Sequence, residues 1–219
     1  MLLVRDLPSR RGRAILRSRL SEVSFGCIAH RRWHGKPMIQ NPRCYVFAET
    51  LRDGTVVTVR AARVDDGPKI RRAFQNLDRD TVYTRFFGYK ADVSDADLAR
   101  ITGADFERAV ALLVTIGIGK DEVVVGGASY VAESSATTAG RSGEVAFLVE
   151  EDFQGRGIAS SLLRHIIAIA QANGLDRLEA DVLSHNLPML NVFRRCGLPM
   201  EVRRAGDVVH AILSLREQG

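Results

Sequence analysis

The sequence predicts a single α/β domain built on a sheet of mixed strands. From Thr50 to the C-terminus, β-branched runs typical of strands alternate with amphipathic segments typical of helices. Hydrophobic residues make up 46% of the 219 residues and charged residues 26%, the proportions of a globular protein, and no internal repeat appears. This length suits one domain of ordinary size preceded by an N-terminal arm.

A turn and a strand open the domain. Asp53-Gly54 is a turn signal, and the β-branched run Thr55–Arg60 that follows is typical of a strand. Residues 65–77 begin with Asp-Asp-Gly-Pro, which predicts a helix start because acids favour the positive end of the helix dipole and proline fits the first turn. Two shorter helices are expected over 80–86 and from Ser94.

The middle of the chain predicts three strands. They cover residues 109–116, 122–131 and 143–149. The turn Gly119-Lys120-Asp121 joins the first two strands, and the tract 132–142, rich in Ser, Thr, Ala and Gly, is expected to be a loop.

The C-terminal part predicts two helices and three strands. A helix over 157–172 is expected to end at Asn173-Gly174, a typical helix stop. The remaining elements are a strand near 178–182, a helix near 188–196, and strands around Met200 and over 208–215.

The net charge of +5 is concentrated in the arm, residues 1–43. The arm holds ten Lys/Arg and two acids, or +8, whereas the rest of the chain holds 21 Lys/Arg and 24 Asp/Glu, or −3. The domain itself therefore does not favour nucleic-acid binding. Four interpretations of the arm stay open: a flexible tail, a segment that contacts anionic lipid or nucleic acid, a transit peptide, or an artefact of start-site choice if translation begins at Met38.

Secreted, membrane-spanning and metal-binding classes are not favoured. The longest apolar stretch, residues 109–118, is about ten residues against the ~20 that a bilayer needs, and no signal peptide is visible. Three cysteines are too few for a disulfide framework, which favours the reducing cytoplasm. Four side chains suggest zinc at first sight, namely Cys27, His30, His34 and Cys44. Their spacing matches no standard ligand pattern, so no metal is expected.

A glycine-rich loop at residues 154–160 joins a predicted strand directly to a predicted helix. Glycines let the backbone approach a ligand, and the first helical N–H groups are unpaired, so the loop suits an anion such as phosphate. An ordinary strand-to-helix turn is the plain alternative. The loop lacks the Gly-Lys-Ser/Thr of a P-loop. A dinucleotide site is disfavoured because Ser160 replaces the third small residue and little sequence follows.

Gln154-x-x-Gly157-x-Ala159 resembles the acyl-CoA pyrophosphate loop of the GNAT N-acetyltransferases. The later pattern Asn186-x-x-Met189-x-x-x-Phe193-x-x-x-Gly197-Leu198 is similar to a second motif of that family. The resemblance covers most of residues 50–216. It implies the GNAT fold, a mixed and mostly antiparallel sheet with flanking helices and splayed central strands.

Within this family the chain resembles the bacterial Pat-type protein lysine acetyltransferases. The similar stretches are Leu51–Thr55, Arg63–Asp66, Tyr83–Phe87, Glu144–Val149 and Val192–Gly197. The resemblance implies acetyl-CoA as co-substrate and a protein lysine as acceptor, notably on AMP-forming acyl-CoA synthetases. The regulatory domain that many members carry does not fit in the short arm.

The resemblance also implies a set of acetyl-CoA contacts. The pantetheine arm is expected to pair with the strand at Phe147, Leu148 and Val149, and Asn186 to approach it from the neighbouring strand end. The pyrophosphate is expected at Gln154, Gly155, Arg156, Gly157, Ile158, Ala159 and Ser160.

Glu144 is the candidate general base. A lysine amine with a pKa near ~10.4 must lose a proton before it can attack a thioester. Glu144 begins the strand before the loop and aligns with the glutamate that the resembling enzymes use as base; a solvated strand-end acid is the plain alternative. Phe193 stands where many GNAT enzymes carry a tyrosine that protonates the leaving thiolate, so water is expected to supply that proton.

Two other functions stay open: N-acetylation of a small amine, and a non-catalytic acyl-CoA-binding regulatory module. Two histidines are not expected to act in either. His165 lies on the polar stripe of its predicted helix and should be exposed, and His210 lies in the last strand with no predicted partner.

Overall fold

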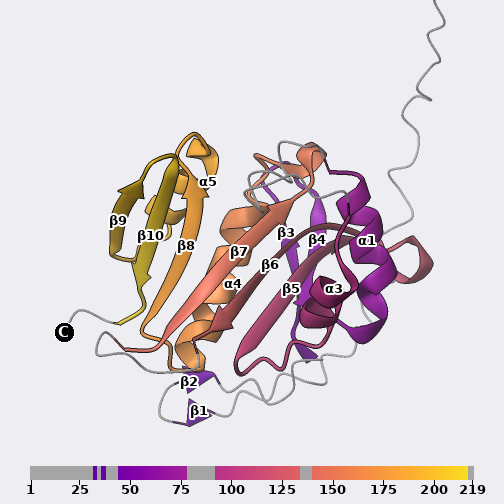
Figure 1. The fold of residues 1–219 in the computed structure, drawn as a ribbon. Coiled ribbons are helices and arrows are strands. Elements are labelled where there is room, and N and C mark those ends of the chain that lie inside the picture. The colour runs from indigo at the N-terminus through magenta and orange to yellow at the C-terminus, as the bar shows by residue number, and fades with distance from the viewer. Residues whose placement is uncertain (1–31, 34–35, 38–43, 78–91, 134–139, 217–219) are drawn as a thin grey trace, which may run out of the picture. The chain divides into compact units, whose positions relative to one another are not determined.

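A computed structural model describes residues 32–33, 36–37, 44–77, 92–133 and 140–216 (Figure 1). The helix predicted over 80–86 and the candidate zinc ligands Cys27, His30 and His34 lie outside these residues. In the described part of the chain, no helix is long and apolar enough to cross a membrane.

The eight-stranded sheet has the order β3-β4-β5-β6-β7-β8-β10-β9. Its strands are β3 (Val46–Thr50), β4 (Val56–Ala61), β5 (Ala109–Ile116), β6 (Val123–Ala132), β7 (Ser142–Val149), β8 (Arg177–Leu183), β9 (Met200–Ala205) and β10 (Val208–Ser214). Neighbours run antiparallel except for β7 and β8, which are parallel. Among the described residues, the short strands β1 (Arg32–Trp33) and β2 (Lys36–Pro37) pair only with each other. The predicted mixed, mostly antiparallel sheet is confirmed.

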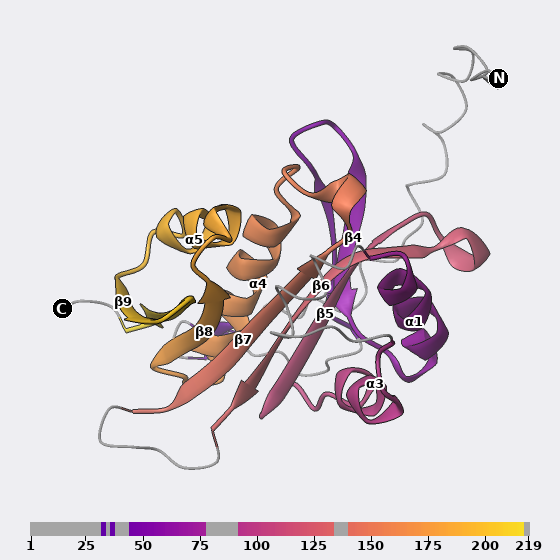
Figure 2. The same cartoon turned by 45° about the horizontal axis from the view of Figure 1, so that its top comes forward.

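Helices cover both faces of this sheet (Figures 1 and 2). The first pair, α1 (Gly67–Gln75) and α3 (Asp95–Thr102), lies on one face, and the second pair, α4 (Ile158–Ala172) and α5 (Leu187–Arg194), lies on the other. Single turns of 3-10 helix connect some elements, at η2 (Val64–Asp66), η3 (Gly119–Asp121) and η4 (Glu151–Phe153).

Alternation along the central strands supplies both cores. In β5, Leu112 joins the large cluster under α4 and α5, whereas Leu113 joins the smaller cluster under α1. On α4, Leu162, Ile166 and Ile169 are almost wholly buried, as the amphipathic pattern predicts. The central strands are therefore apolar on both faces, which is why they read as continuous apolar runs in the sequence.

The one parallel pairing is short. Residues Ser142–Glu144 of β7 pair with Arg177–Glu179 of β8, and beyond Glu144 the two strands part. Figure 1 shows β7 and β8 diverging toward the end where α5 lies. The predicted splayed central strands are confirmed, and this divergence positions the site described below.

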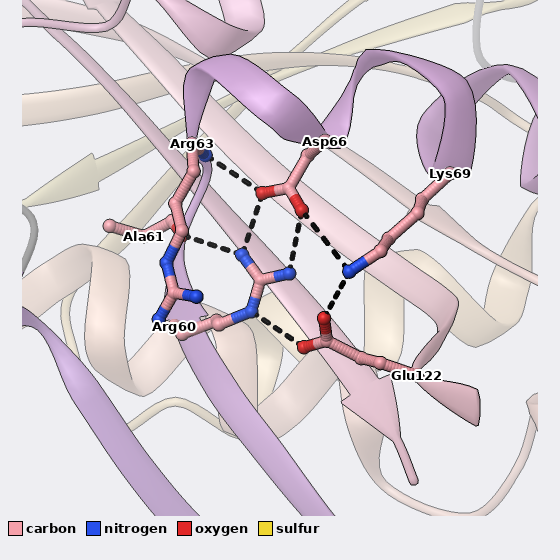
Figure 3. Close-up of polar contacts among 6 residues, drawn as sticks. All are labelled: Arg60, Ala61, Arg63, Asp66, Lys69 and Glu122. Carbon is pink, nitrogen blue, oxygen red and sulfur yellow. Dashed lines mark hydrogen bonds and ion pairs between the residues drawn. The ribbon is translucent and has the colours of Figure 1, made fainter. Parts of the chain in front are cut away.

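A buried ion network attaches η2 and α1 to the sheet (Figure 3). The Arg60 guanidinium, on β4, donates to both carboxylate oxygens of Asp66 (Nη1–Oδ2 2.6 Å, Nη2–Oδ1 2.7 Å) and to Glu122 (Nε–Oε1 2.8 Å). Asp66 also accepts from the backbone N–H of Arg63, and Lys69 pairs with Glu122. Because Arg60 and Asp66 are 2% and 1% exposed, each charge depends on its partners.

The strand β3 is the main element that the sequence analysis did not predict. It pairs with β4 at the edge of the sheet, and Val46 and Phe47 remain more than a third exposed. An edge strand without clear alternation gives only a weak periodic signal.

Candidate functional site

A cleft of about 960 Å³ lies where β7 and β8 part. Such a volume is in the upper part of the range for small-molecule sites. Its walls combine the β7 residues Glu144–Val149, the loop and first turn of α4, the end of β8, and the start of α5. All but one of the predicted site residues line it: Glu144, Phe147, Leu148, Val149, Gln154, Gly155, Gly157, Ile158, Ala159, Ser160 and Asn186.

The β7 edge offers backbone groups to this cleft. The amide of Glu150 donates to the carbonyl of Val125 in β6 (3.1 Å), so by alternation the amides of Phe147 and Val149 point away from β6, toward β8. β8 no longer pairs with β7 at these residues. The Val149 carbonyl accepts a hydrogen bond from the Gln154 side chain (3.1 Å). The backbone groups of Leu148 face β6, where Leu148 lies opposite Gly127. The cleft edge of β7 can therefore pair with an extended ligand.

Two glycines shape the loop before α4. Gly155 (φ +72°) and Gly157 (φ +102°) both adopt left-handed conformations that residues with a Cβ rarely take. Gly157 is the N-cap of α4, so no side chain caps the first turn. The unpaired N–H groups of that turn and the positive end of the helix dipole favour an anion.

Arg52 reaches the cleft, whereas Arg156, the arginine that the sequence analysis proposed, does not. Arg156 forms an ion pair with Asp53 (Nη1–Oδ2 2.9 Å), lies over the Phe153 ring at 4.9 Å, and does not line the cleft. Arg52 lines it, beside Gly157, and its backbone N–H donates to the Arg156 carbonyl (3.3 Å). The β3–β4 turn thus brings a cation to the loop from about a hundred residues away, a contact without a local sequence signal.

The position of α4 depends on a buried histidine. His165 was expected to be exposed on a polar stripe, and this expectation is wrong: it is 9% exposed. Its Nε2 contacts Glu49 Oε1 (2.9 Å), and its Nδ1 contacts the Tyr45 hydroxyl (2.6 Å). Burial lowers the pKa of His165 despite the neighbouring Glu49, so the ring is neutral. Because the carboxylate can only accept, Nε2 carries the proton and Nδ1 accepts from Tyr45.

The same carboxylate holds the first turns of α4 as well. Glu49 accepts from Ser161 and pairs with Arg164 (Oε1–Nη2 2.7 Å). The polar stripe on α4 therefore packs against the β3 strand, which the sequence did not reveal. This contact fixes the helix whose N-terminus faces the cleft.

The far wall of the cleft belongs to α5. Asn186 is the N-cap of this helix, and its Oδ1 accepts from the Met189 amide (3.2 Å). Phe193, which lines the cleft, is 1% exposed and packs edge-on against Phe147, with ring centroids 5.9 Å apart. The site therefore has an apolar wall opposite the β7 edge, and the Phe193 side chain on this wall cannot donate a proton.

Glu144 lies at the point of divergence. It is opposite Glu179 in the last paired rung between β7 and β8, and its side chain is exposed. Val145 faces the core under α4, so alternation places Glu144 on the other face of the sheet. An exposed carboxylate at the inner end of the cleft can accept a proton from a group bound there.

Comparisons with known proteins agree with this geometry. Residues 78–198 match the family described as the Acetyltransferase (GNAT) family. The crystal structure of the GNAT domain of S. lividans PAT is 32% identical and superposes with a TM-score of 0.71, covering 80% of this chain and 99% of that one.

Two curated relatives are also similar. An acetyltransferase of Pseudomonas aeruginosa is 28% identical over 132 residues, which are 60% of this chain and 69% of the relative. The acetyltransferase Pat of Mycolicibacterium smegmatis is 39% identical over 74 residues, 34% of this chain and only 21% of that protein.

Proposed function

Because this chain belongs to the GNAT family of acetyltransferases, and is thus an acetyl-CoA-dependent N-acetyltransferase, we propose that its acceptor is the side-chain amine of a protein lysine. The likeness to the GNAT domain of S. lividans PAT, which covers 99% of that domain, carries this proposal. An AMP-forming acyl-CoA synthetase is the acceptor that the Pat-type resemblance favours, and the low cysteine content suits a cytoplasmic enzyme.

The cleft suggests how this chain holds acetyl-CoA. We place the pantetheine arm along the β7 edge, where the backbone groups of Phe147 and Val149 point into the cleft. The pyrophosphate lies at the amides of residues 154–160 with Arg52 beside it, and Asn186 borders the pantetheine from α5. The parted strands thus give the co-substrate a polar edge and, next to it, an anion site.

The transfer itself needs a proton acceptor. Glu144, directly or through water, takes a proton from the lysine ammonium, and the free amine attacks the thioester carbonyl. A carbon–nitrogen bond forms, the carbon–sulfur bond breaks, and CoA leaves as a thiolate, while the nitrogen loses its second proton to water. Phe193 carries no proton, so water protonates the thiolate.

Substitution of Gly157 by aspartate is expected to weaken acetyl-CoA binding by about 10- to 100-fold, because the variant adds both left-handed strain and a negative charge at the anion site. Isothermal titration calorimetry measures the effect. Gly206→Asp is the matched control, since Gly206 also has a positive φ (+58°) but lies in the β9–β10 turn, where an added Cβ meets nothing within 4 Å. Equal affinity in Gly157→Asp and wild type would refute the placement of the pyrophosphate.

Replacing Arg52 with alanine should raise KM for acetyl-CoA about fivefold with little change in kcat, because a partly solvated charge contact to phosphate is lost while the reacting atoms are untouched. Steady-state kinetics with varied acetyl-CoA test this. Lys120→Ala removes an exposed charge from η3, away from the cleft, and should leave KM unchanged. A fall in kcat alone in Arg52→Ala would contradict the phosphate role.

Free-thiol release with acetyl-CoA tests the acceptor class. The panel contains an AMP-forming acyl-CoA synthetase, the same synthetase with its reactive lysine changed to arginine, and small amines such as spermidine. Release that requires the synthetase lysine, with mass spectrometry of the modified residue, is the expected result. Release with small amines alone would favour a small-amine acetyltransferase, and binding of acetyl-CoA without release on any acceptor would favour a regulatory module.

A further inference from the structure

A second, smaller cavity shares Glu144 and Asp181 with the cleft. It has a volume of about 120 Å³ and is lined by four carboxylates, a serine, a histidine and an alanine: Glu133, Glu144, Glu179, Asp181, Ser142, His210 and Ala180. We call it the acidic pocket. A volume of this size holds the end of one unbranched side chain.

The sheet register brings the acidic pocket together. Glu144 of β7 lies opposite Glu179 of β8, and Asp181 of β8 lies opposite His210 of β10. The ring of His210 contacts Asp181 (Nδ1–Oδ1 2.7 Å) and Glu179 (Nε2–Oε2 3.2 Å). The expectation that His210 has no partner is therefore wrong.

The acidic pocket has more carboxylates than cationic side chains. Arg177 pairs with Glu179, and His210 contacts both Glu179 and Asp181. Glu133 and Glu144 form no ion pair within the part of the chain that the structure describes. A cluster with this excess of negative charge attracts a cation from solvent.

Ser142 gives an independent sign of a ligand. It lies two residues before Glu144 on the same face of β7, lines the acidic pocket and is 1% exposed. Its Oγ has no hydrogen-bond partner among the described residues. A buried hydroxyl without a partner is costly, and a ligand N–H group would satisfy it.

We propose that the acidic pocket admits the acceptor amine and favours lysines that have a second positive charge close by in the acceptor chain. This inference rests on the lysine acceptor proposed above. Acetyl-CoA would fill the larger cleft, so the acceptor must reach Glu144 from another side, and the acidic pocket meets the cleft at that residue. An ammonium has three donors and no acceptor, which matches a lining of carboxylates and one hydroxyl. Glu133, which forms no ion pair among the described residues, then remains for a neighbouring basic side chain, and Asp181 adds to the negative charge that this side chain meets.

Matched peptides test this selectivity. Three peptides differ only in the residue two positions after the lysine, which is arginine, alanine or glutamate. We expect wild-type kcat/KM to be about fivefold higher for the arginine peptide than for the alanine peptide, and lowest for the glutamate peptide. The preference should shrink as salt is raised from 0.05 to about 0.5 M, since exposed charges are then screened.

Variants assign the preference to the pocket. Asp181→Asn keeps the shape of the side chain and a hydrogen bond to His210 but removes the charge. Asp181→Asn and Glu133→Gln should each bring the ratio of kcat/KM for the arginine peptide to kcat/KM for the alanine peptide toward one. Asp121→Asn, on exposed η3, should keep the wild-type ratio. Ser142→Ala should raise KM for the lysine peptide while the melting temperature stays equal or rises, because an unpaired buried hydroxyl is removed.

The outcomes separate this inference from the proposed function. Acetylation of all three peptides with equal kcat/KM, or a preference that persists in both carboxylate variants, would overturn the inference and leave the lysine acetyltransferase standing. A higher kcat/KM for spermidine than for the arginine peptide would assign the pocket to a small polycation and overturn it as well. If no lysine peptide or protein is acetylated although acetyl-CoA binds, the proposed function fails and the inference fails with it.

Discussion

Glu144→Gln is expected to lower kcat by about 10²- to 10⁴-fold while acetyl-CoA affinity stays unchanged, because glutamine keeps the shape of the side chain but cannot accept the proton. Glu144 is exposed and forms no ion pair within the described residues, so the substitution breaks no ion pair. Thiol release measures kcat, and calorimetry measures the affinity. Glu201→Gln, on the exposed strand β9, is the matched control and should retain wild-type turnover.

The pH profile separates a base from a residue that only shapes the site. As pH approaches the lysine pKa of about 10.4, more of the acceptor loses its proton to water, so the deficit of Glu144→Gln should narrow. A deficit that stays constant across this range would show that Glu144 acts on binding or geometry. Wild-type turnover in the variant would remove Glu144 from the mechanism altogether.

Asp66→Asn is expected to lower the free energy of unfolding by about 3–5 kcal/mol, because it breaks a buried pair and leaves the Arg60 guanidinium without its charged partner. Urea denaturation should show a lower midpoint with an unchanged slope. The double variant Arg60→Met with Asp66→Leu removes both charges and should lose less stability than Asp66→Asn alone, since Lys69 and Glu122 still pair with each other. If the double variant lost as much stability as Arg60→Met and Asp66→Leu lose in sum when each is measured alone, the network would not be coupled.

The same network predicts acid sensitivity. Burial opposes ionisation of Glu122, but the hydrogen bonds from Arg60 and Lys69 outweigh it and lower its pKa from 4.5 to about 2. Burial and the same kind of hydrogen bonding act on Asp66, whose pKa is also lowered. A lowered folded-state pKa stabilises the fold fully above the unfolded value, so the contribution of Glu122 is lost as pH falls from about 4.5 through about 2. The stability difference between wild type and Glu122→Gln should therefore be largest above pH 4.5 and vanish below pH 2.

Local signals predicted the elements that carry their own pattern. The β-branched strands, the capped helix beginning after Ser94 and the glycine loop before α4 all appear where the sequence placed them, because period, caps and glycines act over a few residues. The alternation of strand and helix patterns predicted a mixed sheet, whereas its mostly antiparallel order and its divergence followed from the family resemblance. The edge strand β3 was not predicted because its two faces differ little in burial, so its sequence carries no clear alternation.

Contacts between distant segments could not be predicted in this way. Arg52 reaches the α4 loop through the β3–β4 turn, and His165 is buried because β3 supplies Glu49 and Tyr45. Likewise His210 meets Asp181 only through the register of β10 on β8. Each depends on which strands become neighbours, which no single stretch of sequence encodes.

The pairing between β7 and β8 is the weakest connection within the sheet. Only three residue pairs join β7 to β8, whereas seven join β6 to β7 and seven join β8 to β10. The strands β3 to β7 and the strands β8, β10 and β9 are thus two groups joined by a few residue pairs and by the helices behind them. If acetyl-CoA binds between these two groups of strands as proposed above, it adds contacts across the gap, so its binding stabilises the fold as well as loading the enzyme.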